Sequence, residues 1–189
     1  MNSTSVALPS VPVLDTSRLV LRGFRADDFE PWLALSRTPA YHRYFGPEAM
    51  PAEEVWKLLL RSAGHWVVMG YGFWAVEEKA SGRFIGAMGF VNLKRELSPS
   101  LGDAPEIGWV LDPALHGQGY ASEAVAAVLA WGHARFGPVR TVCIIHPDNA
   151  PSMKVAARFG YHEFARTTYH DQPIVLFERA ALPAAWPEN

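Results

Sequence analysis

Cysteine is nearly absent from this chain: Cys143 is the only one among 189 residues. A single cysteine forms no internal disulfide, which is typical of proteins from a reducing compartment. Cys143 lies in an apolar strand pattern with no positive environment indicated, so we interpret it as a core residue rather than a nucleophile. No basic segment precedes a hydrophobic run near the start of the chain. These features predict a cytoplasmic protein.

Long hydrophobic runs and a strong charge bias are also lacking. The longest uncharged stretch, residues 62–76, is interrupted by glycines and is too short to span a bilayer. The formal net charge is -2, without a basic block. Nucleic-acid-binding proteins usually carry a positive patch. We therefore expect neither a membrane nor a nucleic acid as a partner.

Several catalytic motifs are missing as well. The seven histidines show no His-Glu-x-x-His spacing, so we expect no metal. There is no Gly-x-Ser-x-Gly elbow of a serine hydrolase and no Gly-Lys-Ser/Thr of a phosphate-binding loop. A dinucleotide-binding motif needs a third glycine after Gly117 and Gly119, and Ser122 stands there. Metal hydrolysis, serine hydrolysis, P-loop chemistry and nicotinamide binding are thus disfavoured.

The composition suits one domain with a sizeable core, since 49% of the residues are hydrophobic and 12% are aromatic. Residues 1–13 contain Ser and Pro without periodicity, which predicts a flexible arm. Residues 14–180 read as a single domain, and residues 181–189 as a Pro-containing tail. No repeat or internal linker marks a second domain.

Strand and helix patterns follow one another in an order that predicts a mixed α/β (α+β) fold. Strands are expected at residues 18–23, 72–77, 84–92, 106–111, 141–145, 161–169 and 172–179. Helices are expected after residue 28, after residue 51, over residues 120–136 and after residue 149. The crossover from residue 106 to residue 145 should be right-handed, which makes its two strands parallel neighbours. The remaining strands should pair mostly antiparallel.

A glycine turn joins the strand at residues 106–111 to the helix at residues 120–136. Gly117 and Gly119 precede the helix, whose first amides have no intrahelical partners and carry partial positive charge. Such a turn can cradle a phosphate group, or it can be a strand-to-helix connection that holds nothing.

Two segments together resemble the GCN5-related N-acetyltransferase (GNAT) superfamily. The loop His116-Gly117-Gln118-Gly119-Tyr120-Ala121 is similar to the first signature of that family. Asn149, Ser152 and the pair Gly160-Tyr161 are similar to the second. Residues 16–22 resemble the opening of the branch of ribosomal-protein alanine acetyltransferases (RimJ/RimL-like). The resemblance covers residues 14–180.

The resemblance implies a fold and a reaction. It implies a sheet of six to seven strands with a splayed parallel pair, flanked by about four helices. Acetyl-CoA would be the co-substrate, and a small-molecule or peptide amine would attack its thioester directly. The alternative is a catalytically weak module of the same fold that binds acyl-CoA as a sensor or partner protein. A monomer and a homodimer both remain open.

The resemblance also assigns residues to the co-substrate. The backbone of Trp109, Val110 and Leu111 would bind the pantetheine arm. The diphosphate would lie on the loop and helix start, at His116, Gly117, Gln118, Gly119, Tyr120, Ala121 and Ser122. His116 stands where the family usually has Arg or Gln, so it is either a phosphate donor or an exposed loop histidine.

Three polar residues are candidates for chemistry or positioning. Glu106 lies on the co-substrate strand and is either a general base or a carboxylate paired with a nearby Arg. Ser152 is either a proton donor near the co-substrate or a hydroxyl bonded back to its own helix. Asn149 either contacts pantetheine or caps the helix that follows it. The tyrosine that many family members use as the acid is replaced here by Ala156.

The acceptor site is the least specified part of the sequence. We expect it between the first two helices, the strand containing Phe73 and the last hairpin. The aromatic residues of that region are more typical of a core than of a pocket: Trp32, Tyr41, Tyr44 and Phe45. None of them identifies the amine.

Overall fold

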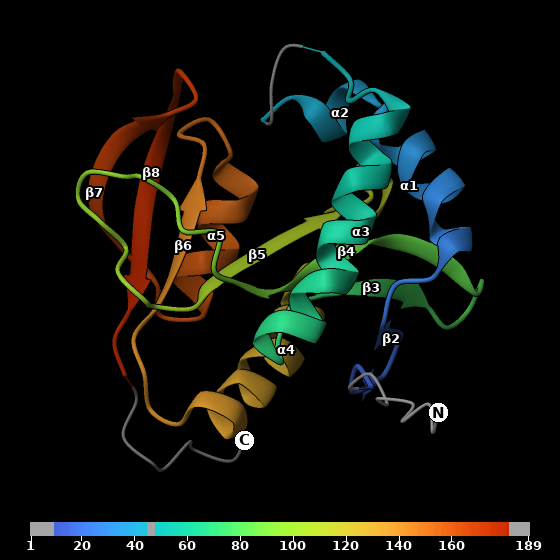
Figure 1. Cartoon of the computed structure of the whole chain (residues 1–189), viewed down its shortest axis with the longest axis horizontal. Coiled ribbons are helices and arrows are strands. Elements are labelled where there is room, and N and C mark those ends of the chain that lie inside the picture. The colour runs from blue at the N-terminus through green and yellow to red at the C-terminus, as the bar shows by residue number, and fades with distance from the viewer. Residues whose placement is uncertain (1–9, 45–47, 182–189) are drawn as a thin grey trace, which may run out of the picture.

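The computed structural model describes residues 10–44 and 48–181. Most of the predicted arm and tail, and also Phe45, therefore lie outside the described residues. One sheet contains eight strands in the order β1-β2-β3-β4-β5-β6-β8-β7 (Figure 1). The strands are β1 (Leu14–Asp15), β2 (Leu19–Arg22), β3 (Phe73–Glu78), β4 (Arg83–Val91), β5 (Glu106–Leu111), β6 (Thr141–Ile145), β7 (His162–Tyr169) and β8 (Gln172–Arg179).

The mixed, mainly antiparallel sheet confirms the predicted fold class. Among the pairs of neighbouring strands, β5 and β6 are parallel and the others are antiparallel. The described part has one strand more than the predicted maximum of seven. That strand is β1, whose two residues pair with Leu21 and Val20 of β2. A two-residue strand is too short to produce an alternating pattern.

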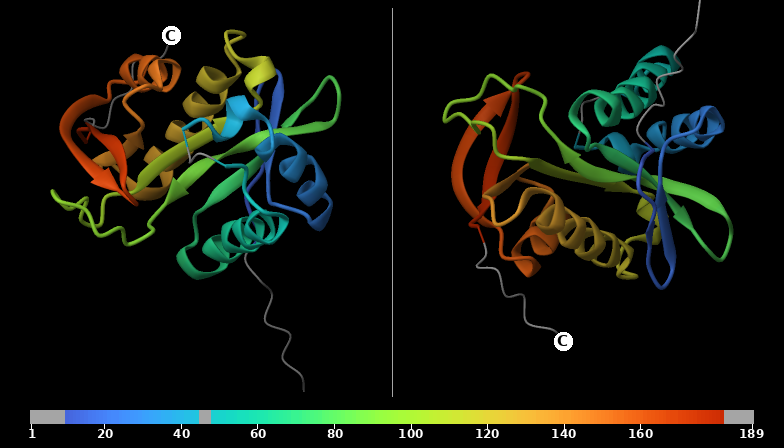
Figure 2. Two further views of the ribbon diagram at one scale, coloured as in Figure 1. Left: turned by 90° about the horizontal axis from the view of Figure 1, so that it is seen from above. Right: turned by 60° about the horizontal axis from the view of Figure 1, so that its bottom comes forward.

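The helices cover both faces of the sheet. They are α1 (Phe29–Ser36), α2 (Pro39–His42), α3 (Ala52–Met69), α4 (Tyr120–Phe136) and α5 (Ala150–Arg158). Figure 2 shows α1 and α3 on one side of the sheet and α4 and α5 on the other. The single-turn helix α2 was not predicted, because a stretch of four residues carries no measurable helical period.

Two large hydrophobic clusters fix the helices to the sheet. One joins α4 and α5 to β2–β6 and β8, and the other joins α1 and α3 to β3 and β4. Trp32 and Tyr41 belong to the second cluster, and the indole Nε1 donates to the Tyr41 hydroxyl at 2.9 Å. These two aromatic residues are therefore core, as the sequence favoured.

The residues before β5 cover a third patch of the sheet. Leu101 packs with Val142 of β6 and with Ile174 and Leu176 of β8, and Leu97 and Ala104 lie against this group. The 92–105 loop thus lies against the sheet beside the start of β5. Within the residues described, no helix is both long and apolar enough to cross a membrane.

Candidate functional site

The parallel pair β5 and β6 is joined at one end only. Its single register pair is Glu106 with Val142, and the Val142 amide donates to the Pro105 carbonyl at 3.1 Å. From Gly108 onward, β5 has no register partner in β6, and the two strands diverge (Figure 1). The residues 108–110 are only half-buried in the middle of an eight-stranded sheet. The sheet therefore contains an open backbone edge.

The direction of the backbone groups along β5 follows from one hydrogen bond. The Asp112 amide donates to the Ile85 carbonyl of the β4 strand at 2.8 Å. Because backbone groups alternate between the two sides of a strand, those of Val110 also face β4. Those of Trp109 and Leu111 then face the open edge. An extended ligand can pair with such an edge as an additional strand would.

The glycine turn leads from this edge to α4. Gly117 and Gly119 have φ values of 76° and 84°, in the left-handed region that favours glycine. The first hydrogen bond of the helix runs from the Glu123 amide to the Gly119 carbonyl at 3.0 Å. The amides of residues 120–122 therefore precede the helical ladder. Residues 116–119 are exposed and residues 120–122 are half-buried, so the turn lies at the surface, where a helix N-terminus can bind a phosphate.

A carboxylate holds the turn against the start of the domain. Glu123 accepts hydrogen bonds from the Thr16 hydroxyl at 2.6 Å, the Arg18 amide at 2.7 Å and the Arg18 Nε at 2.6 Å. Arg18 Nη1 also donates to the Gln118 carbonyl at 2.8 Å. Burial alone would raise the pKa of Glu123, but these hydrogen bonds hold that pKa below its ordinary value. The turn is thus fixed before any ligand arrives.

The side chain of Tyr120 also helps to hold the glycine turn in place. Its ring lies under the Arg18 guanidinium, with 4.2 Å between Cζ and the ring centroid. Its hydroxyl donates to Glu78 Oε1 at 2.6 Å, and this hydrogen bond raises the pKa of Tyr120. The side chain of Tyr120 is therefore engaged within the protein. Its contribution to a ligand site would be its backbone amide at the start of α4.

A cation that the sequence analysis missed lies at the N-terminus of α4. Arg158, from the last turn of α5, donates from Nη1 to the Ser122 hydroxyl at 3.0 Å. This contact joins the two helices that follow the diverging strands. In the sequence, Arg158 is an ordinary basic residue in the last turn of a helix, and nothing relates it to Ser122. His116 is exposed at the start of the glycine turn.

The second motif forms the start of α5. Asn149 Oδ1 accepts a hydrogen bond from the Ser152 amide at 3.1 Å, so Asn149 is the helix cap. The hydroxyl of Ser152 is half-buried and, within the described chain, has no hydrogen-bond partner. The alternative in which it bonds back to its own helix is therefore not the arrangement found.

Glu106 lies where the two parallel strands meet, and it is paired with a cation. Arg95 donates from Nε to Oε2 at 2.7 Å and from Nη2 to Oε1 at 2.9 Å. The side chains are 15% exposed for Arg95 and 8% for Glu106. Burial opposes the charge on Arg95, but Glu106 keeps the pKa of the guanidinium above its ordinary value. Glu106 thus forms an ion pair with a nearby Arg, which is one of the two arrangements expected for this residue.

A cavity of about 290 Å³ lies beside this ion pair. It is formed by the 92–105 loop and the first residue of β5. Its lining residues are Asn92, Leu93, Lys94, Arg95, Ser100, Leu101, Gly102, Asp103, Ala104 and Glu106. The cavity differs from the predicted acceptor location in that the loop before β5 supplies the walls, rather than the first two helices.

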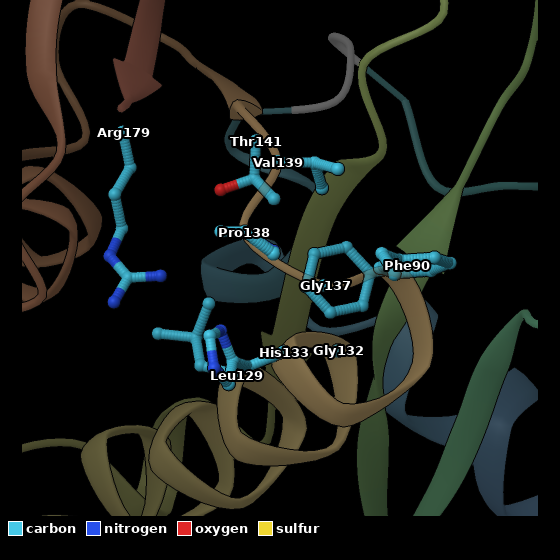
Figure 3. A pocket seen from close by; sticks show the side chains of 10 residues that line it. Phe90, Leu129, Gly132, His133, Gly137, Pro138, Val139, Thr141 and Arg179 are labelled. Atoms are coloured by element: carbon cyan, nitrogen blue, oxygen red, sulfur yellow. The ribbon is translucent and has the colours of Figure 1, made fainter. Parts of the chain in front are cut away.

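A second cavity lies far from the glycine turn, at the other end of α4. Figure 3 shows it between Phe90, His133, Thr141 and Arg179. Its volume is about 20 Å³, enough for roughly one water molecule. It is too small for a co-substrate or an amine acceptor.

Two further residues near the diverging strands have defined environments. Cys143 is buried in β6, and burial raises the pKa of its thiol, which confirms the interpretation of a core residue. His146 follows β6, and its Nδ1 accepts a hydrogen bond from the Asp148 amide at 3.1 Å. The ring centroids of His146 and Tyr44 are 5.8 Å apart, so the segment that follows α2 lies close to the end of β6.

Known proteins are similar to this chain in sequence and in fold. A family model described as an acetyltransferase (GNAT) domain matches residues 18–162. A structure from Bordetella pertussis, assigned to the GnaT family of acetyltransferases, is 31% identical with a TM-score of 0.79, over 90% of this chain and all 100% of that one. YoaA of Bacillus subtilis, named an uncharacterized N-acetyltransferase, is 26% identical over 153 residues, which are 80% of this chain and 84% of YoaA.

One neighbour of the same fold was solved with its ligand. RimL, a ribosomal L7/L12 alpha-N-protein acetyltransferase in complex with coenzyme A, has a TM-score of 0.71 at 18% identity. The match covers 89% of this chain and 98% of that structure. At this identity, the likeness concerns the fold.

Proposed function

Because the chain belongs to the GNAT family of acetyltransferases, we propose that it transfers the acetyl group of acetyl-CoA to a primary amine. The observation that carries the proposal is the open edge of β5, which runs from the Glu106–Val142 pair to the glycine turn. An extended pantetheine chain and a diphosphate are the two parts of coenzyme A that such an edge and turn would hold.

The residues present fit this co-substrate. Trp109 and Leu111 would offer backbone groups to pantetheine, with Val110 between them forming part of the wall. The amides from Gly117 to Ser122 would hold the diphosphate. Arg158, which contacts the Ser122 hydroxyl, would add a positive charge, and His116 would add a hydrogen-bond donor. Asn149 and Ser152 would lie along the other side of the arm.

The chemistry requires a neutral amine beside the thioester. An amine bound as an ammonium loses one proton, and its nitrogen lone pair then attacks the thioester carbon. A C–N bond forms, the nitrogen gives up a second proton, the C–S bond breaks, and the sulfur leaves as a thiolate that takes up one proton. We assign the first proton to Glu106 and propose that the Ser152 hydroxyl relays the second from the nitrogen to the sulfur, so that the hydroxyl is restored in the same step. Holding the two reactants together would supply much of the rate.

Two measurements test the proposal together. Calorimetry with acetyl-CoA should show binding, and a thiol-reactive dye should report the release of coenzyme A when a panel of amines is added. Binding without thiol release for every amine would instead support the sensor module. Absence of binding would contradict both functions.

Replacing Ser152 with Ala is expected to lower kcat about 10-fold, because the departing sulfur loses a hydrogen-bond donor. The affinity for acetyl-CoA should change much less, since the hydroxyl acts on the sulfur alone. Steady-state kinetics and calorimetry check the two quantities. Ser62→Ala is the control, because the Ser62 hydroxyl bonds to the Leu58 carbonyl within α3. Loss of affinity without loss of kcat would contradict the assignment.

Replacing Arg158 with Met is expected to weaken the binding of coenzyme A about 10-fold, because one charge-assisted contact to the diphosphate is removed. The dissociation constant is measured by calorimetry. Arg61→Met removes an equal charge from α3, on the opposite face of the sheet, and should leave the dissociation constant unchanged. Equal affinities for all three proteins would remove Arg158 from the site.

A further inference from the structure

We propose that the cavity beside Glu106 binds a free α-amino acid, whose ammonium group pairs with Glu106 and whose carboxylate pairs with Arg95. The inference rests on the proposed function and specifies its acceptor. It is carried by one juxtaposition: a buried pair of opposite charges lines a small cavity at the closed end of the open β5 edge.

The Arg95–Glu106 ion pair carries one charge of each sign and therefore matches the two charges of a zwitterion. Arg95 and Glu106 meet in a bidentate geometry, which matches the planar fork of a guanidinium to the two oxygens of a carboxylate. A bound amino acid presents one group of each sign at a short separation. Its carboxylate can replace that of Glu106 on Arg95, and its ammonium can replace Arg95 on Glu106.

This exchange leaves every buried charge with a partner. Leaving a buried charge unpaired is strongly unfavourable, so a ligand with only one charge cannot enter in the same way. An amine without a carboxylate would separate Arg95 from Glu106 and leave Arg95 with its contact to the Tyr169 ring, 4.8 Å from Cζ to the ring centroid, but without a counter-charge. The pair thus discriminates between a free amino acid and the same compound without its carboxylate.

The position of Glu106 connects the cavity to the reaction. This residue forms the register pair with Val142 at which the β5 edge closes, and it also lines the cavity. An ammonium group on Glu106 therefore lies at the end of the edge that would guide the thioester. When Arg95 turns to the incoming carboxylate, the oxygens of Glu106 become available to accept the ammonium proton.

The size and the rim of the cavity agree with a small ligand. Its volume of about 290 Å³ lies just below the usual range of ligand pockets, about 300–1,000 Å³. The rim carries an exposed Lys94–Asp103 ion pair at 2.9 Å. The other lining groups include the polar side chains of Asn92 and Ser100.

The experiment compares each L-amino acid with its own carboxamide, which keeps the amine and removes the carboxylate charge. Thiol release is measured with acetyl-CoA, and products are identified by mass. At least one free amino acid should have a kcat/KM about 10-fold or more above that of its amide. Equal values for acid and amide, or transfer only to amines that lack a carboxylate, would overturn the amino-acid assignment alone. No transfer to any amine would overturn the proposed function as well.

A variant of Arg95 and a binding measurement test whether this residue binds the carboxylate of the amino acid. Arg95→Lys keeps a charge beside Glu106 but removes the fork, and should raise the KM of the amino acid about 10-fold. Calorimetry with the amino acid in the presence of coenzyme A should show the same loss of affinity. The control is Arg166→Lys, because Arg166 forms an equally bidentate but exposed pair with Glu163. Unchanged amino-acid binding in Arg95→Lys would overturn the assignment of Arg95.

Discussion

Replacing Glu106 with Gln should lower kcat/KM for the amine by about 10²–10⁴-fold, the usual contribution of a positioned base. An amide side chain keeps the size of the carboxylate but neither attracts an ammonium group nor accepts its proton. The binding of acetyl-CoA should persist, because we assign that binding to the backbone of β5 and to the glycine turn. Steady-state kinetics with varied amine and calorimetry with acetyl-CoA measure the two effects separately.

The controls for this variant concern stability. Removing the charge of Glu106 leaves the largely buried Arg95 without a counter-charge, in contact with the ring of Tyr169, and this can cost up to about 3–5 kcal/mol of unfolding free energy. Denaturant unfolding therefore accompanies the kinetics, and Arg95→Met combined with Glu106→Gln removes both charges together. Glu163→Gln breaks the exposed pair with Arg166 and should leave turnover unchanged. Turnover within a factor of about three of wild type in a folded Glu106→Gln protein would exclude Glu106 as the base.

Local patterns in the sequence were sufficient for much of the fold. The predicted ranges 106–111, 120–136 and 141–145 coincide with β5, α4 and β6. Each of these elements is long enough to show its period and is bounded by Gly, Pro or Asp, which mark turns. The glycines at positions 117 and 119 also have the positive φ values that such a turn requires.

The contacts between side chains that are distant in the sequence could not be predicted from local patterns. Glu106 and Arg95 are 11 residues apart, and their contact depends on how the 92–105 loop folds back over β6 and β8. Arg158 reaches Ser122 only because the crossover places α5 beside α4. Neither pair lies at a spacing that a helix or a strand would bring together. Glu106 and Ser122 were therefore predicted as site residues from the sequence, whereas their partners Arg95 and Arg158 were not.

The open edge of β5 links these observations. The glycine turn follows one end of this edge, and the Glu106–Arg95 pair and the cavity lie at the other. Co-substrate binding and acceptor binding are thus assigned to opposite ends of one strand. Substitutions at the two ends should therefore have separate effects. Those in the turn should change the affinity for coenzyme A, and those in the ion pair should change kcat/KM for the amine.

Replacing Gly119 with Val should weaken the binding of coenzyme A about 100-fold or more. Gly119 has a φ of 84°, which a β-branched residue strongly disfavours, so the backbone must change where it enters α4. The amides of residues 120–122 would then no longer converge on one phosphate group. Losing two charge-assisted hydrogen bonds, at about 1.5–3 kcal/mol each, gives an effect of this size. Calorimetry with coenzyme A measures the dissociation constant.

The matched control for this variant is Gly82→Val in the turn between β3 and β4. Gly82 has a φ of 67°, and no atom lies within 4 Å of the position that its Cβ would take. At Gly119 the nearest atom to that position is Arg18 Nη2 at 3.4 Å, an ordinary contact. Both substitutions therefore add backbone strain of about 1–3 kcal/mol, and at neither position does the added Cβ clash with a neighbouring atom. Because the strain is shared, a loss of affinity confined to Gly119→Val is attributable to the amides at the start of α4, whereas wild-type affinity in that variant would show that the diphosphate is held elsewhere.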